Sequence, residues 1–218
     1  MDIISLSQIP GAQIIYNYLY SNSGSMPGIF LSSCNGNLRN NSIIGHSIGL
    51  SLANSSPLVG ANEIYGNLIN GIYVGYGSIP DLRASLIGHP PNQYPVSGYN
   101  SIFENGGYTE EGSGSSNDDG SEIYFNNSNI QMESGCNLIA DDRIPQHPLE
   151  TTLLLMNGTT TNRISARYNC WGDTVYTARF GGLTVKYSPY YSEPCTFSGD
   201  IPLVMQDNDG NTLDTVYS

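Results

Sequence analysis

The chain has 218 residues, a length typical of one or two domains, and its formal net charge is −12 with only seven Lys and Arg residues. So few basic residues exclude the basic surface that nucleic-acid binding requires, and an anionic polysaccharide would be repelled unless a cation bridged the two. No run of ~18 apolar residues occurs, so we expect no membrane span. Gly (25) and Tyr (16) are abundant while charged residues make up 12 %, which favours a β-rich extracellular surface over disorder.

One phrase returns along the first half of the chain: Asn, x, apolar, x, x, Asn, then Gly, apolar, x, apolar. We take its corresponding positions to be Asn17, Asn41, Asn67 and Asn100, with a weaker copy at Asn127. A repeat of this size predicts stacked units, because one such unit cannot bury its own apolar residues. Asn tolerates left-handed backbone at a corner, and its amide can bond to the same amide one unit above. The alternative is a set of ordinary antiparallel hairpins with Asn and Gly turns.

In chain order, the pattern predicts a first strand within residues 1–12 and three successive coils over 13–37, 38–61 and 62–87. The first five residues lack the basic region and long apolar core of a signal peptide. No cap for an open solenoid end is visible before Gln13, so we expect upstream coils of a longer chain as a partner.

Three stretches interrupt the pattern, and we expect each to be a loop. Proline, which breaks central strand ladders, marks the loop at 89–95, and polar and acidic residues mark the loops at 108–120 and 141–148. Long loops on a regular scaffold are where function often resides.

The last third reads as further strands followed by a change of pattern. A buried strand is expected at 151–156, and Trp171 is expected to pack as a cap, with stacking on a sugar as the alternative. An Asp-Gly turn between 201–206 and 212–217 predicts a hairpin. We therefore divide the chain into a solenoid at 1–197 and a C-terminal hairpin at 198–218, where a secretion or sorting β domain would start.

The four cysteines show no spacing typical of a zinc site. They are Cys34, Cys136, Cys170 and Cys195. These cysteines have two interpretations: disulfides, which we expect if the protein is exported, or buried thiols.

The repeated phrases at 17–31, 41–52 and 67–74 resemble the generic repeat of right-handed parallel β-helix proteins of the pectin-lyase-like superfamily. The resemblance implies an all-β fold, a right-handed single-stranded parallel β-helix with Asn and Gly at its corners. Three flat faces of short parallel strands would then surround a core of Ile, Leu, Val and stacked Tyr.

A second resemblance lies near the end of the chain. The segment 168–173, Tyr-Asn-Cys-Trp-Gly-Asp, and the segment 185–191 are similar to the ending that closes many bacterial exported β-helices. Lys186 and Tyr190 depart from the commonest residues of that ending. This resemblance implies an extracellular or cell-surface protein, and in such proteins a β-sandwich secretion domain often follows the helix.

The superfamily holds lyases, hydrolases, adhesins and inert scaffolds, so the fold does not fix an activity. Our first hypothesis is an extracellular scaffold that contacts carbohydrate without catalysis. The alternatives are a polysaccharide lyase or glycoside hydrolase acting on a uronate-containing glycan, and an adhesin or phage-type fibre segment. For a lyase, Asp141, Asp142 and Arg143 are the candidate catalytic residues, because they resemble part of an arginine-containing pectate-lyase signature.

Two further sets of residues are candidates for binding. Tyr73, Tyr76 and Tyr108 are the candidate carbohydrate contacts, because a binding face needs exposed Tyr and Asn. No cofactor is required by the first hypothesis; calcium is the alternative, because it binds clustered oxygen ligands. The candidate ligands for calcium are Asp118, Asp119 and Glu122.

Overall fold

The fold was analysed in a computed structural model, which is all-β. It describes residues 2–22, 24–88, 93–106, 120–141, 152–157, 163–172, 180–181, 184–188, 190–191, 202–206 and 212–217. Across these residues every regular element is a strand. No helix in this part of the chain is long and apolar enough to cross a membrane.

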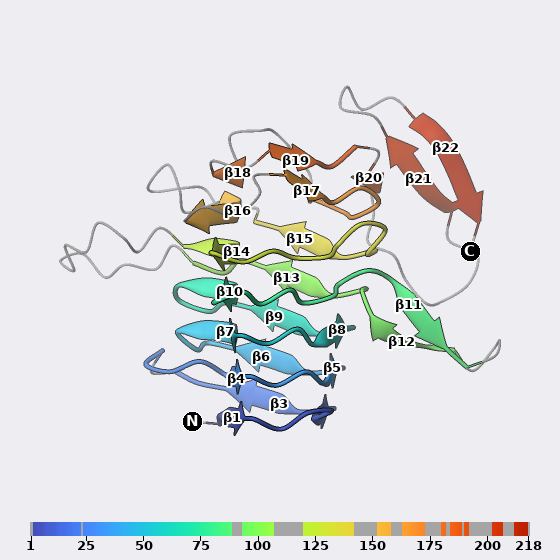
Figure 1. The fold of residues 1–218 in the computed structure, drawn as a ribbon. Helices are drawn as coiled ribbons and strands as arrows, with labels where there is room; N and C mark the ends of the chain where they lie inside the picture. The colour runs from blue at the N-terminus through green and yellow to red at the C-terminus, as the bar shows by residue number, and fades with distance from the viewer. Residues whose placement is uncertain are drawn as a thin grey trace.

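The chain visits three parallel sheets in turn and then returns to the first, and we call each such circuit a coil (Figure 1). The first sheet contains β1 (Ile4–Ser7), β4 (Ile29–Ser32), β7 (Ile48–Ala53), β10 (Asn70–Gly75), β14 (Ser121–Asn126), β16 (Thr152–Asn157) and β18 (Phe180–Gly181). The second contains β2 (Gln13–Ile15), β5 (Asn37–Arg39) and β8 (Leu58–Gly60). The third contains β3 (Tyr18–Tyr20), β6 (Ser42–Ile44), β9 (Glu63–Tyr65), β13 (Ser101–Phe103) and β15 (Leu138–Ala140).

Every pairing within these three sheets is parallel and joins equivalent strands of neighbouring coils. A short parallel pair, β17 (Arg163–Ser165) with β19 (Thr184–Lys186), continues the arrangement in the last coils. The alternative of ordinary antiparallel hairpins is therefore wrong for the repeated part of the chain.

Like side chains lie over like inside the stack. In the first sheet Leu50, Ile72 and Ile123 share one register position, and each is 0 % exposed. The middle residues of the three-residue strands in the third sheet form a similar column: Leu19, Ile43, Ile64, Ile102 and Ile139. A three-residue strand has one inward position, so stacking of coils is what buries it.

We expected stacked tyrosines in the core, but those of the third-sheet column lie outside it, whereas Tyr187 and Tyr190 near the C-terminal end pack against it from partly buried positions. The rings of Tyr65 and Phe103 stack at 4.9 Å between their centroids, but they occupy outward positions of the third sheet and are only half-buried. Tyr20, in the same column, is 49 % exposed. The side-chain period of two explains the error, since the core side chain in each of these strands is the one between the outward pair.

A row of asparagine side chains follows one corner of the stack from coil to coil. In each step the side-chain Nδ2 donates to the Oδ1 of the next Asn at 2.8–3.0 Å, and the backbone N donates to the same oxygen at 3.0–3.1 Å. The row consists of Asn17, Asn41, Asn62, Asn100, Asn137 and Asn169. The residue before each member has a left-handed φ between 49° and 59°.

This row corrects the predicted correspondence. Asn62, and not Asn67, is equivalent to Asn41. Asn67 belongs to a second row at the opposite end of the third-sheet strands. There its Oδ1 accepts a hydrogen bond from the backbone N–H of His46, and its Nδ2 donates to Oδ1 of Asn105. Asn127 belongs to neither row and lies at a corner after β14 with φ of 49°.

Two antiparallel hairpins project from the same side of the stack (Figure 1). The first pairs β11 (Ser85–Ile87) with β12 (Tyr94–Ser97). Tyr94 and Pro95, which we expected in a loop at 89–95, therefore lie in a strand, while residues 89–92 are outside the described part. The second pairs β21 (Pro202–Gln206) with β22 (Thr212–Tyr217), as the Asp-Gly turn predicts. β21 also pairs with β20 (Tyr190–Tyr191). The domain boundary at residue 198 stays a prediction.

Trp171 is completely buried near the C-terminal end of the stack. Its ring meets Phe180 edge-on at 5.3 Å, and Phe180 in turn contacts Tyr187 at 5.4 Å. The packing interpretation therefore holds, and the alternative of sugar stacking on Trp171 is wrong.

The asparagine row makes a first prediction about stability. Asn62→Ala removes the oxygen that accepts both the backbone N–H and the Nδ2 of Asn41 inside the protein. Leaving these buried donors unpaired should lower the free energy of unfolding by about 3 kcal/mol. Urea denaturation measures the change, with Asn22→Ala as the control at an exposed position. The control should change stability by less than about 0.5 kcal/mol, and equal effects of the two substitutions would contradict the role of the row.

Candidate functional site

The outer face of the first sheet carries an aromatic column. Phe30 pairs in register with Ser51, Ser51 with Tyr73, and Tyr73 with Tyr124. These positions alternate with core residues, so their side chains point away from the stack. The sequence analysis identified Tyr73 but missed Tyr124 and Phe30. The alternation in Ile123-Tyr124-Phe125 was the available signal.

Tyr73 and Tyr124 form a stacked pair on this face. Their ring centroids are 5.5 Å apart and their planes differ by 14°. The ring of Tyr73 lies over Gly75, where an added Cβ would come 2.6 Å from its Cε1 atom. Asn126 donates its Nδ2 to the Tyr73 hydroxyl at 2.9 Å. Tyr73 is thus positioned by its packing over Gly75 and by the hydrogen bond from Asn126, and we call the Tyr73–Tyr124 pair the aromatic platform.

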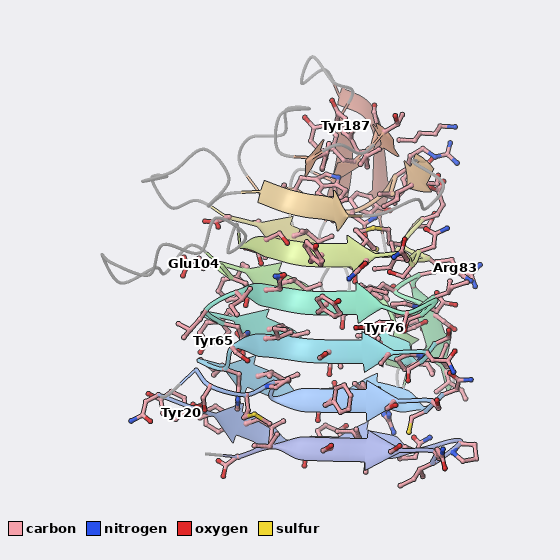
Figure 2. The ribbon with its side chains drawn as sticks, turned by 60° about the vertical axis from the view of Figure 1, so that its left-hand side comes forward. Tyr20, Tyr65, Tyr76, Arg83, Glu104 and Tyr187 are labelled. Carbon is pink, nitrogen blue, oxygen red and sulfur yellow. The ribbon has the colours of Figure 1, made fainter. Side chains whose placement is uncertain are left out.

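Tyr76, the second predicted carbohydrate contact, lies just beyond the end of β10 at a corner with φ of 54°. Its backbone N donates at 3.3 Å to the backbone carbonyl of Asn126, the residue whose side chain bonds to the Tyr73 hydroxyl. The side chain is 69 % exposed, and Figure 2 shows it beside the first-sheet strands. The third predicted contact, Tyr108, lies outside the described residues.

Most of the predicted catalytic residues fall outside the described part of the chain. Asp142 and Arg143 are among them, as are the predicted calcium ligands Asp118 and Asp119. Asp141 follows β15 directly and is only 3 % exposed. The catalytic assignment therefore stays a prediction.

Glu122, the remaining predicted calcium ligand, is 0 % exposed at the start of the first-sheet strand β14. Its two carboxylate oxygens accept the backbone N–H of Asn105 at 2.9 Å and the Asn105 side-chain amide at 2.6 Å. The carboxylate thus continues the second asparagine row. Within the described residues no group of three His, Cys, Asp or Glu side chains could hold a metal ion.

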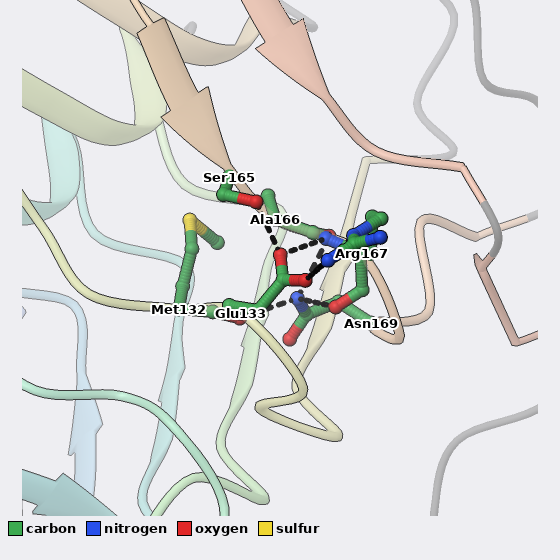
Figure 3. Close-up of polar contacts among 6 residues, drawn as sticks. All are labelled: Met132, Glu133, Ser165, Ala166, Arg167 and Asn169. Carbon is green, nitrogen blue, oxygen red and sulfur yellow. Dashed lines mark hydrogen bonds and ion pairs between the residues drawn. The ribbon is translucent and has the colours of Figure 1, made fainter.

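An ion pair joins neighbouring coils near the C-terminal end of the stack (Figure 3). Arg167 donates its Nε to Glu133 Oε1 at 2.6 Å and also contacts it through Nη2, while Ser165 donates its hydroxyl to Oε2 at 2.5 Å. Burial works to raise the pKa of Glu133, but the hydrogen bonds and charge of Arg167 and the bond from Ser165 outweigh it and lower that pKa. Glu133 is therefore ionised at neutral pH and is unsuited to be a general acid, which needs a raised pKa.

The comparisons with known proteins give no family. No protein-family model, no curated protein and no solved structure matches this chain. The interpretation of its surface therefore rests on the residues themselves.

The Glu133–Arg167 pair predicts a pH dependence. Because the folded-state pKa of Glu133 is lowered, its contribution to stability is present above the ordinary value of 4.5 and is lost as the pH falls through the folded pKa. The side chains are 26 % and 33 % exposed, so Glu133→Gln should cost up to about 1 kcal/mol at pH 7. Below the folded-state pKa the cost should shrink towards zero.

Urea denaturation of both proteins across this pH range measures the difference. Glu63→Gln is the matched control, since exposed Glu63 accepts a hydrogen bond from Ser42 rather than from an arginine. A cost of Glu133→Gln that grows as the pH falls would contradict this assignment.

Proposed function

We propose that the chain is a right-handed parallel β-helix of an extracellular or cell-surface protein, and that it contacts carbohydrate through the aromatic platform without catalysis. The observation that carries the proposal is the Tyr73–Tyr124 stack on the outer face of the first sheet. Parallel sheets whose strands return in register support the solenoid, as do the asparagine bonds at its corners.

The platform has the chemistry of a sugar-stacking surface. Tyrosine presents a flat apolar ring for the C–H face of a pyranose and a hydroxyl at its rim. The ring of Tyr73 is already held in place by Gly75 and Asn126, so little side-chain freedom remains to be lost on binding. Exposed Tyr76 adds a second aromatic side chain near the end of the same strand.

The charge of the chain selects among glycans. With 19 acidic and seven basic residues, the protein repels uronate chains and imposes no such penalty on neutral ones. We therefore infer a neutral polysaccharide as the partner of the platform.

Three of the carboxylates that the structure describes are engaged in bonds that stabilise the scaffold. Asp81 is bonded to Arg83, Glu133 to Arg167 and Glu122 to Asn105. A general acid or base needs a free carboxyl group with a suitable pKa. Export is supported by the disulfide bond of Cys136, since disulfides persist in oxidising compartments, although Cys34 and Cys170 are not disulfide-bonded.

The binding proposal is tested by Tyr73→Ala and Tyr124→Ala. Each should weaken retention in gels containing mannan, galactan, xylan or β-glucan, by about tenfold for the best of these, because stacking contributes about 1 kcal/mol beyond buried area. Tyr73→Phe keeps the ring and should retain binding. Tyr20→Ala, at a 49 % exposed tyrosine of the third sheet, is the control. Equal losses in the platform and control variants, or no retention of wild type in any gel, would contradict the proposal.

The same samples separate binding from lyase activity. Incubation with polygalacturonate and alginate, with and without calcium, should give no unsaturated product by ultraviolet absorbance. Product formation that disappears in Arg143→Ala would replace the scaffold by the lyase alternative.

A further inference from the structure

A cavity lies on another side of the stack from the aromatic platform, at the base of the hairpin formed by β11 and β12. It has a volume of about 380 Å³, which is within the range of small-ligand sites. Its lining comes from three coils and from the hairpin: Leu58, Asp81, Arg83, Ala84, Ser85, Ser97, Glu133 and Ser134.

The walls of this cavity are fixed by close backbone packing. The hairpin leaves the coil beside Ala84 and returns at Gly98, where an added Cβ would come 2.6 Å from the Ala84 Cα. Its second strand lies over Gly60, where a Cβ would approach the Val96 carbonyl carbon to 2.7 Å. Ser97 is buried and donates its hydroxyl to the backbone carbonyl of Arg83 at 2.6 Å. These contacts preform the cavity between the hairpin and the coils.

Both carboxylates in the lining are already compensated. Arg83 forms a bidentate ion pair with Asp81, in which Nε donates to Oδ1 at 3.0 Å and Nη2 donates to Oδ2 at 2.7 Å. Burial works to raise the pKa of Asp81, but the hydrogen bonds and charge of Arg83 outweigh it and lower that pKa. Glu133 is held in the same way by Arg167. Because both carboxylates of the lining are paired with arginines, the cavity does not favour a cationic ligand. An anionic ligand would have to compete with Asp81 for Arg83.

The remaining hydrogen-bonding groups of the lining suit a ligand with several hydroxyl groups. The Arg83 guanidinium is oriented by its pair with Asp81, yet its side chain is 54 % exposed and retains N–H groups beyond the two given to the carboxylate. Exposed Ser85 and Ser134 add hydroxyl groups that both donate and accept. Leu58, 37 % exposed, adds an apolar surface.

We propose that this cavity is a second carbohydrate site, which binds a single neutral hexose unit through Arg83, Ser85 and Ser134, with Leu58 under the C–H face of the ring. The class of ligand agrees with that inferred for the aromatic platform, but the residues are different. The site does not depend on binding at the platform, so the two can fail separately.

The test uses the chain with its Arg side chains labelled for NMR and the methyl glycosides of glucose, galactose and mannose as probes. At least one should shift the Nε–H signal of Arg83. Arg83→Ala should weaken that glycoside at least about tenfold, as measured by saturation transfer from protein to sugar, because a charge-assisted hydrogen bond is lost. Arg83→Lys should weaken it similarly, because lysine lacks the planar fork that grips Asp81.

A cavity-filling variant and a platform variant complete the design. Ser85→Tyr places a large ring in the cavity from an exposed position and leaves the residues of both ion pairs unchanged, and it should also abolish binding. Tyr73→Ala should leave methyl glycoside binding unchanged, whether or not it weakens retention by polysaccharides. The proposal is overturned if no neutral glycoside binds, if glucuronate or glucosamine binds more tightly than the neutral sugars, or if Ser85→Tyr binds as well as wild type.

Discussion

The convergence of two donors on one asparagine oxygen is the interaction on which this structure depends. In each step of the row a backbone N–H and a side-chain amide of one Asn reach the Oδ1 of the next. The same amide also donates to a carbonyl of the preceding coil, as Asn62 does to Leu38 at 2.9 Å. A slip of one residue would break all three bonds and turn every side chain of the neighbouring strands to the wrong face. The row therefore fixes register for the whole stack.

Register at this corner also determines what the outer faces present. Once Asn62 lies over Asn100, Tyr65 lies over Phe103 in the third sheet. In the first sheet the same stacking brings Tyr73 over Tyr124. Neither aromatic pair needs a long-range contact of its own to form, because the buried corner supplies the alignment. The spacing of aromatic rings on a surface built in this way is the spacing of the strands.

The asparagine row accommodates inserted segments of chain, because each insertion leaves the stack after one asparagine of the row and rejoins it before the next. Successive asparagines are 24 and 21 residues apart in the first coils, but 38, 37 and 32 apart in the later ones. The first long step contains the hairpin of β11 and β12, which builds the cavity around Arg83. The scaffold thus adds local structure without altering the stacking above and below it.

The recurrent phrase was enough to predict stacked parallel strands, but it could not assign the asparagines. Each phrase contains two polar positions flanking a third-sheet strand, such as Asn62 and Asn67, and both lie in hydrogen-bonded rows. Spacing alone does not distinguish them. Glu133 and Arg167, 34 residues apart, could not be paired from sequence because inserted segments hide the coil length. The misplaced Asn67 follows a step of the row without an insertion, whereas beyond Asn100 the inserted segments hide Asn137 and Asn169.

The sequence predicts the net charge of the chain but does not show which of its carboxylates are paired with arginines. The sequence shows an excess of acidic residues, but the structure shows that Asp81 and Glu133 are neutralised locally by arginines. Seven basic residues against 19 acidic ones leave an excess of negative charge, which sets the sign of the surface potential. A uronate chain approaching the aromatic platform meets that potential at long range, before any stacking energy is gained. A neutral glycan would not, so the proposed binding at the aromatic platform would select its partner by charge before shape.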